Sequence, residues 1–417
     1  MSEPRLLAGL TGAGPGSLAS HIATYGEVFP LSASDRARFP SELTASGLRG
    51  RGGAGFPAGI KAAAVAGRPR SVIIVNGSES EPMSVKDRVL LTRTPHLVID
   101  GALLAAEALG AREVVLVAAP EVLAVLREAL DERGPSARHA VEIRLAPGGA
   151  GYVAGEETAL IAHLEGRAAL PRVKLRLPVE SGLRGRPTLV QNAETMAHVA
   201  LIARYGATWF RERGTSAHPG TTLVTLSGAV AAPGVYEVPL GVALPELPAI
   251  AGGAVEPIRA LLVGGYFGAW VDADGAGSTL DDTSLGTIGA AIGAGVIVVL
   301  GESACPVAET ARLAAWMSAE SAGQCGPCVH GLASLADVLE RIATGRTHPG
   351  DTELLTRWTA MVRGRGACRH PDGVARMIAT ATRVFSAELA DHARRGPCRA
   401  CDAPATLRTP YRITRAA

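Results

Sequence analysis

Between residues 71 and 163, short apolar runs rich in β-branched residues alternate with longer runs of helical composition. The strand candidates are Ser71–Val75, Glu113–Ala118 and Val141–Leu145, and the helix candidates are Leu97–Gly110, Pro120–Arg133 and Gly155–His163. Strands that alternate with helices are joined by crossover connections, which place the strands parallel in one sheet with helices on its faces. The sequence therefore predicts an α/β fold built on a parallel sheet.

The pattern changes near residue 220. Four short strand candidates follow there, separated by Gly and Pro turns: Thr222–Ser227, Gly234–Val238, Arg259–Val263 and Val296–Leu300. They predict a small β-rich domain. From Pro306 to about His392 the sequence is helical in character, and the tail is expected to be irregular. We expect four regions, namely residues 1–215, 216–303, 304–395 and a tail of 396–417.

Charge and composition exclude some classes of function. The net charge is +2, the arginines are scattered and aromatic residues make up 4% of the chain, so nucleic-acid binding is not expected. The longest uncharged stretches contain Pro or many Gly residues, so no membrane insertion is expected. The start of the chain lacks a signal-peptide pattern, which predicts a cytoplasmic protein. In that setting, C-x-x-C pairs favour metal or redox chemistry over disulfides.

Lysine is rare in this chain. Among 41 basic residues, only Lys61, Lys86 and Lys174 are lysines. A compact ammonium and a planar guanidinium are not interchangeable where an anion is closely packed. All three lysines fall in or beside the motifs described next, so we interpret them as functional.

The first motif is GLRGRGGAGFP, residues 47–57. It contains G-x-G-x-x-G, but no strand precedes it, so it is not an ordinary dinucleotide fingerprint. Clustered glycines let backbone N–H groups approach an anion or a flat ring, and the helix candidate that follows would offer its N-terminus to a phosphate. This motif predicts a ligand-binding loop.

Three further motifs carry polar side chains. VNGSESEPMSVKDR, residues 75–88, leaves the carboxyl end of the first strand candidate, where ligands bind in open α/β sheets. GGAGYVAGEETALIAHLEG, residues 148–166, is a Gly-rich turn that enters a helix with acidic residues in its first turn. The fourth, residues 170–199, ends an apolar run at Gln191 and Asn192 and then begins a helix.

Together, in order and spacing, these motifs resemble the NADH-oxidising flavoprotein subunit of respiratory complex I. The related diaphorase subunits of NAD-linked hydrogenases and formate dehydrogenases share them, and the resemblance spans roughly residues 45–375. It implies a parallel-sheet FMN-binding domain, a small β-grasp domain and a C-terminal helical iron–sulfur domain. It also implies transfer of electrons from NAD(P)H through FMN to an iron–sulfur cluster, with a ferredoxin-like protein or a small iron–sulfur subunit as a redox partner.

The resemblance also assigns site residues. The FMN pocket would comprise Gly50, Arg51, Gly52, Gly53, Lys61, Asn76, Glu79, Ser80, Tyr152, Gly155, Glu156, Glu157, Gln191, Asn192 and Thr195. NAD(H) would stack over the flavin near Phe56, Glu81 and Lys174. The family has aromatic residues where this chain has Ala64 and Leu177, so the nucleotide pocket is expected to be weaker.

The iron–sulfur motif also departs from the family. Cys325, Cys328 and Cys368 match its ligands, but Ala322 replaces the first cysteine. A [4Fe–4S] cluster is normally held by four thiolates. Three alternatives follow: a substitute ligand, a three-iron cluster or the absence of a cluster. We expect Cys398 or Cys401 to complete the site.

Other assignments compete for these residues. His330 and His370 are further candidate ligands, and a zinc site built from the two C-x-x-C pairs competes with the cluster, although their separation exceeds common zinc spacings. Cys305 is expected to be an ordinary buried thiol. The alternatives to NADH oxidation are a relay module fed by a ferredoxin-like protein and a degenerate scaffold.

Overall fold

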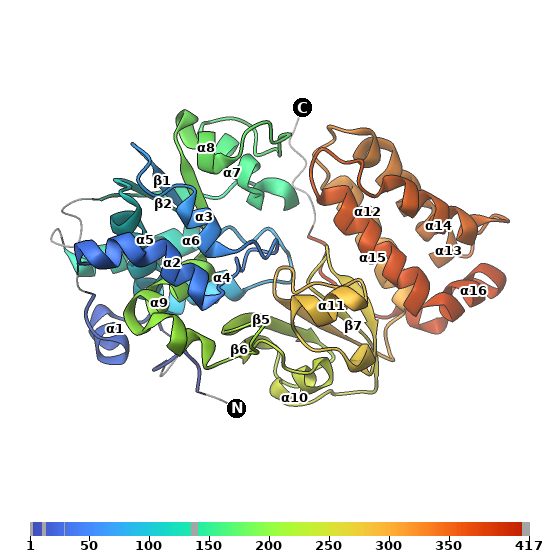
Figure 1. Ribbon diagram of the computed structural model, residues 1–417. Coiled ribbons are helices and arrows are strands. Elements are labelled where there is room, and N and C mark those ends of the chain that lie inside the picture. Colours follow the sequence, from blue (N-terminus) through green and yellow to red (C-terminus); the bar gives the residue numbers. More distant parts are fainter. Residues whose placement is uncertain (1–2, 11–13, 29, 135–140, 411–417) are drawn as a thin grey trace.

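The computed structural model describes residues 3–10, 14–28, 30–134 and 141–410. The chain forms three parts in sequence order (Figure 1): a parallel sheet with its helices, a second sheet, and a group of C-terminal helices. This confirms the predicted fold class.

The first sheet has four parallel strands in the order β3-β2-β1-β4. They are β1 (Val72–Asn76), β2 (Glu113–Ala118), β3 (Glu142–Pro147) and β4 (Thr188–Asn192). Three of the four lie within a residue or two of the predicted strands. The apolar run that ends at Asn192, which was not predicted as a strand, is β4 and lies beside β1.

Helices cover both faces of this sheet. The helices of this part are α1 (Leu18–Tyr25), α2 (Ala33–Ser46), α3 (Ala58–Ala63), α4 (Lys86–Arg93), α5 (Pro95–Leu109), α6 (Pro120–Arg133), α7 (Glu157–Leu164), α8 (Pro178–Ser181) and α9 (Ala193–Arg211), with short 3₁₀ turns at η2 (Tyr152–Gly155) and η3 (Leu183–Gly185). Alternate residues of β1 face opposite layers. Ile73 packs with α5 and α9, whereas Ile74 packs with α7.

The second sheet has the order β6-β5-β9-β7-β8. Its strands are β5 (Thr221–Gly228), β6 (Gly234–Pro239), β7 (Ile258–Val263), β8 (Ala269–Asp272) and β9 (Val296–Gly301), and it carries η4 (Leu244–Glu246), α10 (Leu247–Ile250), η5 (Gly275–Gly277) and α11 (Asp282–Thr287). The first and last strands, β5 and β9, are parallel neighbours, and each outer pair is antiparallel. This is a β-grasp arrangement. The four-residue β8 was not predicted.

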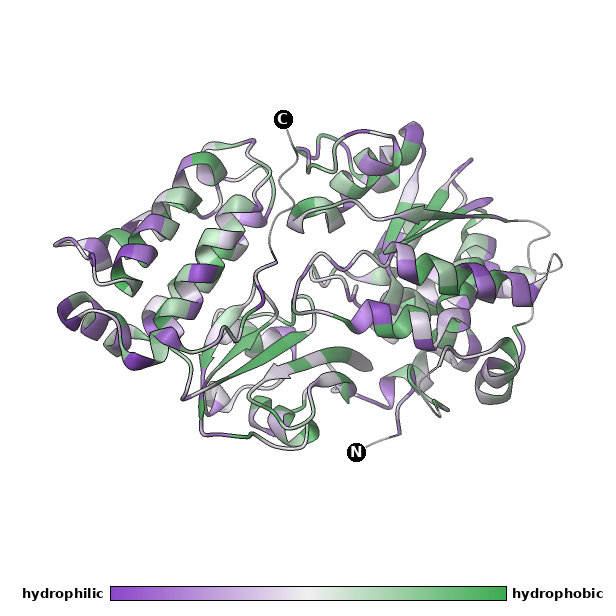
Figure 2. Cartoon of the chain, turned by 180° about the vertical axis from the view of Figure 1, so that it is seen from behind, coloured by the Kyte–Doolittle hydropathy of each residue, from purple (hydrophilic) through white to green (hydrophobic). Residues whose placement is uncertain are grey.

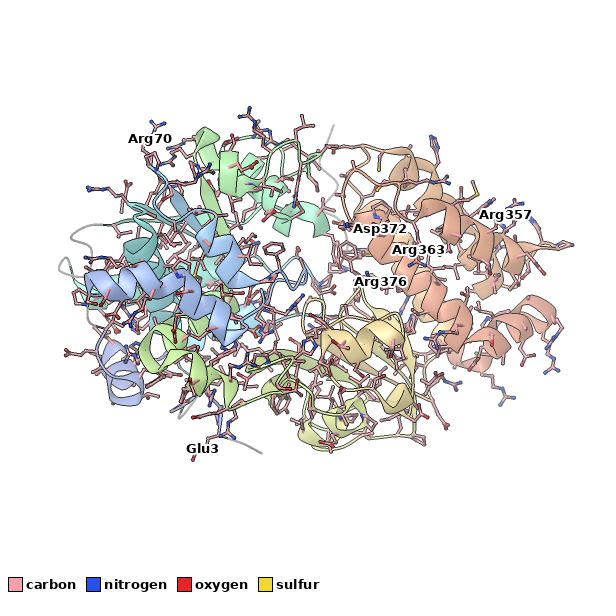
Figure 3. The ribbon with its side chains drawn as sticks, viewed as in Figure 1. Glu3, Arg70, Arg357, Arg363, Asp372 and Arg376 are labelled. Carbon is pink, nitrogen blue, oxygen red and sulfur yellow. The ribbon has the colours of Figure 1, made fainter. Side chains whose placement is uncertain are left out.

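The C-terminal part consists of α12 (Pro306–Ala319), the π-helical turn η6 (Pro327–Leu332), α13 (Ala333–Ala343), α14 (Asp351–Val362), α15 (His370–Val384), α16 (Ser386–Arg395) and η7 (Arg399–Asp402). It shares one buried core with a face of the second sheet. A Cβ atom on Gly373 of α15 would lie 2.2 Å from the ring of Phe267, so glycine is needed for this close approach. Arg376, labelled in Figure 3, reaches from α15 to the carbonyl of Phe267.

The strands of both sheets are mostly hydrophobic, and polar residues gather on the outer faces of the helices (Figure 2). Within the described ranges, no single helix is long and apolar enough to cross a membrane. Helices α4 and α5 pass that test only as a pair bent by 91°.

Candidate flavin and iron–sulfur sites

The carboxyl ends of β1 and β4 lie side by side at the point where the strand order reverses, which is where open α/β sheets have their ligand crevice. The chain runs from β1 to β2 on one side and later returns to β4 on the other. Asn76 and Asn192 are the last residues of the two strands and are paired in register. The Asn192 amide donates to the carbonyl of Asn76 at 3.3 Å.

The Gly-rich loop folds over this crevice. The N–H of Gly50 bonds the carbonyl of Phe56 at 2.8 Å, and the N–H of Arg51 bonds Oγ1 of Thr195 at 2.9 Å. Gly52 approaches Asn192 so closely that a Cβ atom would lie 3.2 Å from Asn192 Cβ. The N–H groups of Gly52 and Gly53 have no hydrogen-bond partner among the described residues. These donors fit an anionic or planar ligand.

The second and third motifs meet beside the same crevice. The amide of Asn76 donates to the carbonyl of Gly155 at 2.9 Å, and its oxygen accepts the N–H of Ser78 at 3.0 Å. A Cβ atom on Gly155 would lie 2.9 Å from Oγ of Ser80. The hydroxyl of Ser78 is buried beside Gly148 and has no hydrogen-bond partner within the described chain.

Two of the three lysines share one carboxylate. Lys61 Nζ lies 2.8 Å from Glu157 and 3.0 Å from the carbonyl of Val190 in the middle of β4. Lys174 Nζ lies 2.8 Å from Glu157 and 3.0 Å from Glu156. Burial opposes ionisation of Glu157, but the two ammonium groups hold its pKa below the usual value. The structure thus brings together Lys61, Lys174 and both glutamates of the third motif.

Lys86 differs from the other two lysines because its side chain is only 3% exposed. Its ammonium lies 2.8 Å from Asp87 and 2.9 Å from Glu194. Although burial opposes it, Lys86 lowers the pKa of Glu194 to about 2, with help from His198 and Arg51. This buried ion group fixes the start of α4 against the start of α9, a structural role that the sequence did not reveal.

The carboxylates of Glu79 and Glu81 both accept hydrogen bonds from other residues of the chain. Glu79 accepts the N–H groups of Asp87 and Arg88 and the hydroxyl of Ser84, so it caps α4. Glu81 is buried, and its Oε2 accepts the Tyr152 hydroxyl at 2.9 Å and the Tyr266 N–H at 2.8 Å. The predicted contacts of both glutamates with flavin or nucleotide remain predictions.

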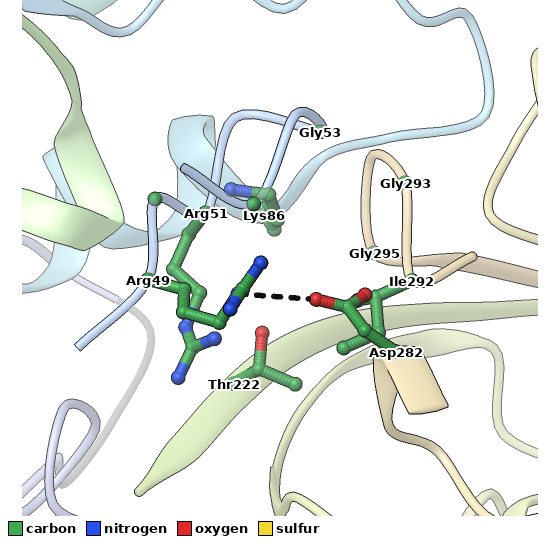
Figure 4. A pocket seen from close by; sticks show the side chains of 11 residues that line it. Arg49, Arg51, Gly53, Lys86, Thr222, Asp282, Ile292, Gly293 and Gly295 are labelled. Atoms are coloured by element: carbon green, nitrogen blue, oxygen red, sulfur yellow. Dashed lines mark ion pairs between the residues drawn. The ribbon is translucent and has the colours of Figure 1, made fainter. Parts of the chain in front are cut away.

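A pocket opens on the side of the Gly-rich loop that faces the second sheet (Figure 4). Gly50, Arg51 and Gly53 line it together with Lys86 and the Gly293–Gly295 turn. Arg49 and Asp282 form an ion pair of 3.3 Å across it. Gln191 is buried below the loop, with Oε1 3.9 Å from the position of a Cβ atom on Gly50.

The side chains at the positions expected to contact the nucleotide are exposed to solvent. Phe56 is 50% exposed and Leu177 is 52% exposed, and Ala64 also lies on the surface. Aromatic rings at the last two positions would offer stacking surfaces that this chain lacks. The weakened nucleotide pocket remains a prediction.

Three cysteines gather at the base of the C-terminal helices. Cys325, Cys328 and Cys368, the last just before α15, lie close enough to interact electrostatically. The candidate ligand His370 is buried, and its Nε2 already pairs with the carbonyl of Met317 at 2.8 Å, whereas His330 is exposed. Three thiols fit an iron–sulfur cluster, with Ala322 in place of a fourth.

Aromatic rings connect the two sites. Tyr152, three residues before Gly155, packs its ring 4.8 Å from that of Phe267 and 5.9 Å from that of His370. His370 follows Cys368 by two residues. These rings therefore join the segment that carries Gly155 to the segment that carries Cys368.

The remaining cysteines form a second group, which the sequence did not predict. Cys305, His392, Cys398 and Cys401 have ligand atoms all within 4.8 Å of one another, and no other such group occurs in the part of the chain that the structure describes. The prediction that Cys398 completes the iron–sulfur site gains no support from this arrangement. Cys305 is buried, as expected, but it is not an isolated thiol.

Known families match both sites. The family described as "Nuo51 FMN-binding domain" matches residues 43–201. The "NADH-ubiquinone oxidoreductase-F iron-sulfur binding region" matches residues 308–392, a range that leaves out Cys305, Cys398 and Cys401.

Individual relatives match most of the chain. The second of the NADH-quinone oxidoreductase F subunits of Rhizobium meliloti is 34% identical over 85% of this chain and 88% of its own length. The NADH-quinone oxidoreductase F subunit of Mycobacterium bovis is 34% identical over 85% of this chain and 84% of its own length. A crystal structure of an NAD⁺-reducing [NiFe]-hydrogenase in the H₂-reduced state matches with a TM-score of 0.80 and 34% identity. That match covers 86% of this chain and 63% of the hydrogenase chain. This chain therefore belongs to the family of NADH-quinone oxidoreductase F subunits.

Proposed function

We propose that this chain is an NADH-oxidising electron-entry subunit, with FMN in the crevice at β1 and β4 and an iron–sulfur cluster at Cys325, Cys328 and Cys368. The observation that carries the proposal is the convergence of four separate motifs on the carboxyl ends of two adjacent strands. The unpaired N–H groups of Gly52 and Gly53 supply donors there.

FMN takes up electrons as a pair and releases them singly, which is the chemistry that joins a nicotinamide to an iron–sulfur cluster. The chain's own residues would bind FMN and orient it. Gly52 and Gly53 present backbone donors, Asn76 and Asn192 fix the strand ends, and Lys61 places a positive charge beside them. No side chain needs to act as a general acid in hydride transfer.

The proposed partner is a redox protein that takes electrons from the cluster. The relatives are subunits by name, and the similar structure is a hydrogenase that reduces NAD⁺. Either a small iron–sulfur subunit or a ferredoxin-like protein suits this role. We also propose a cytoplasmic location, because all six cysteines are free thiols, as is usual in a reducing compartment.

A second candidate function is a relay fed by a protein instead of NADH. The exposed Ala64 and Leu177, which stand where the family has aromatic rings, favour it. In that case the chain would bind FMN and a cluster, but NADH would not reduce the flavin.

Cofactor content tests the proposal. The chain should be purified without oxygen, reconstituted with FMN, iron and sulfide, and desalted. We expect about one FMN and three to four irons per chain. Retention of neither flavin nor iron by a correctly folded chain would contradict the proposal and favour a scaffold.

A further inference from the structure

Four side chains outside the proposed redox sites converge around one point at the end of the C-terminal helices. Cys305 Sγ lies 3.4 Å from Cys401 Sγ, which lies 3.8 Å from Cys398 Sγ. Nε2 of His392 lies 3.5 Å from the Cys305 sulfur and 3.9 Å from the Cys401 sulfur. All four ligand atoms lie within 4.8 Å of one another.

These separations match a tetrahedral site. Zinc–sulfur bonds of about 2.3 Å at tetrahedral angles place two sulfurs about 3.8 Å apart, and with a zinc–nitrogen bond of about 2.05 Å the sulfur–nitrogen separation is about 3.6 Å. The separations in this chain scatter around both values. A single ion could therefore bind all four atoms with shifts of a few tenths of an ångström.

The ligands come from three segments that are distant in sequence. Cys305 is the N-cap of α12, His392 lies in the last turn of α16, and Cys398 and Cys401 are the N-cap and the third residue of η7. Cys305 and His392 are buried, whereas Cys398 is exposed, so an ion could enter from the tail side. Backbone N–H groups also approach the sulfurs: Ala308 donates to Cys305 at 3.4 Å. Such bonds stabilise metal-bound thiolates.

We propose that Cys305, His392, Cys398 and Cys401 bind one structural Zn²⁺ ion. Three cysteines and one histidine in a closed tetrahedron form a zinc set, and four protein ligands leave no open position for catalysis. Binding would release three thiol protons and leave the imidazole neutral. This inference does not depend on flavin binding or on NADH oxidation.

The site would hold the tail in place. Beyond Cys401 the chain returns along α12, where the N–H of Thr406 bonds Glu309 at 2.8 Å and Leu407 is buried. Two aromatic side chains then hold the tail, one that follows β7 and one in α12. Tyr266 donates its hydroxyl to the carbonyl of Arg408, and Trp316 Nε1 donates to the carbonyl of Pro410. Zinc would anchor the start of this segment.

Metal content is the first test. The full chain, without a polyhistidine tag and grown with zinc and iron, should contain about one zinc in addition to its iron. C401S should lose most of the zinc and keep its iron. The matched control C368S should show the opposite: it should lose iron and keep zinc. Zinc that survives C401S, or a site that holds iron and no zinc, would overturn the proposal.

Two further measurements need no variant. Cobalt loaded into the metal-free chain should give the intense visible bands of a tetrahedral thiolate site, and one equivalent of zinc should remove them. Removal of zinc should also speed tryptic cleavage after Arg399, which is exposed in the tail. Peptide mapping that shows a disulfide between Cys305 and Cys401 in the chain as purified without oxygen, or cleavage that is unchanged after zinc removal, would contradict zinc as the tail's anchor.

Discussion

The hydroxyl of Tyr152 donates a hydrogen bond of 2.9 Å to Oε2 of Glu81, and the same oxygen accepts the N–H of Tyr266 at 2.8 Å. This contact joins the turn beside the flavin crevice to the second sheet. Burial raises the pKa of Glu81 to about 7, although the Tyr266 N–H and the Tyr152 hydroxyl partly offset it. Glu81 therefore titrates near neutral pH at the junction of two parts of the molecule.

This shift predicts a pH-dependent stability. The folded-state pKa lies above the ordinary value of 4.5, so the contribution of Glu81 is greatest below pH 4.5 and falls as the pH rises toward 7. The loss is about 3 kcal/mol, after which stability stays level with respect to this group. Thermal unfolding between pH 5 and 8 should show a smaller fall in Tm for E81Q than for the unmodified chain. Parallel pH profiles of the two proteins would contradict the assignment.

Lys61 should matter for flavin binding and little for folding. In K61M, Glu157 keeps Lys174 as a partner, so the change in Tm should be small. A charge-assisted contact contributes about 1.5–3 kcal/mol, so the Kd for FMN should rise at least about tenfold. Fluorescence titration of the flavin-free protein measures it. An unchanged Kd would remove Lys61 from the flavin site.

Lys86 should show the opposite behaviour. K86M leaves Asp87 and Glu194 buried without their ammonium partner. Removal of one member of a buried ion group costs about 3–5 kcal/mol, so chemical denaturation should show a large loss of stability. A K86M protein as stable as the unmodified chain would contradict the structural role.

Gly373 should be intolerant of a side chain. The methyl group of G373A would meet the Phe267 ring at 2.2 Å, and such overpacking costs about 1–3 kcal/mol. Gly286, in helix α11, has nothing within 4 Å of its Cβ position, so the control G286A should be neutral or slightly stabilising. Differential scanning calorimetry compares the two variants. Equal Tm values would show that α15 does not pack so closely on Phe267.

Substitution of Ala322 tests whether this position faces the proposed cluster. In A322C a fourth thiol joins Cys325, Cys328 and Cys368, and iron retention in air should increase because four thiolates hold a [4Fe–4S] cluster. S321C places a thiol one residue away and is the matched control. If the two variants lose iron at the same rate, residue 322 does not face the cluster.

Local patterns predicted most of the fold. The apolar runs at β1 and β2 are long and β-branched, so the sequence predicted them as buried strands. In contrast, β8 is only four residues long and directly follows a glycine. The three lysines, which the sequence analysis interpreted alike as functional, form different kinds of ion pair. Lys61 and Lys174 both pair with Glu157 of the third motif, but Lys86 supports a buried ion group whose partner Glu194 is more than 100 positions away.

The second cysteine group was beyond the reach of sequence reasoning. Cys305 and His392 are separated by 87 positions, and only the packing of α12 against α16 brings them together. The C-x-x-C pair in the tail was visible, but nothing in the sequence specified whether it would meet Cys325 and Cys328 or Cys305. Long-range pairing of this kind depends on tertiary structure.

The most direct test of the central claim is a spectrum of the reconstituted, oxygen-free protein before and after addition of NADH. Loss of the oxidised flavin absorbance on addition of stoichiometric NADH, with electrons passing on to the iron–sulfur cluster, is the result we predict. A flavin that dithionite reduces but excess NADH does not would contradict NADH oxidation and leave the protein-fed relay.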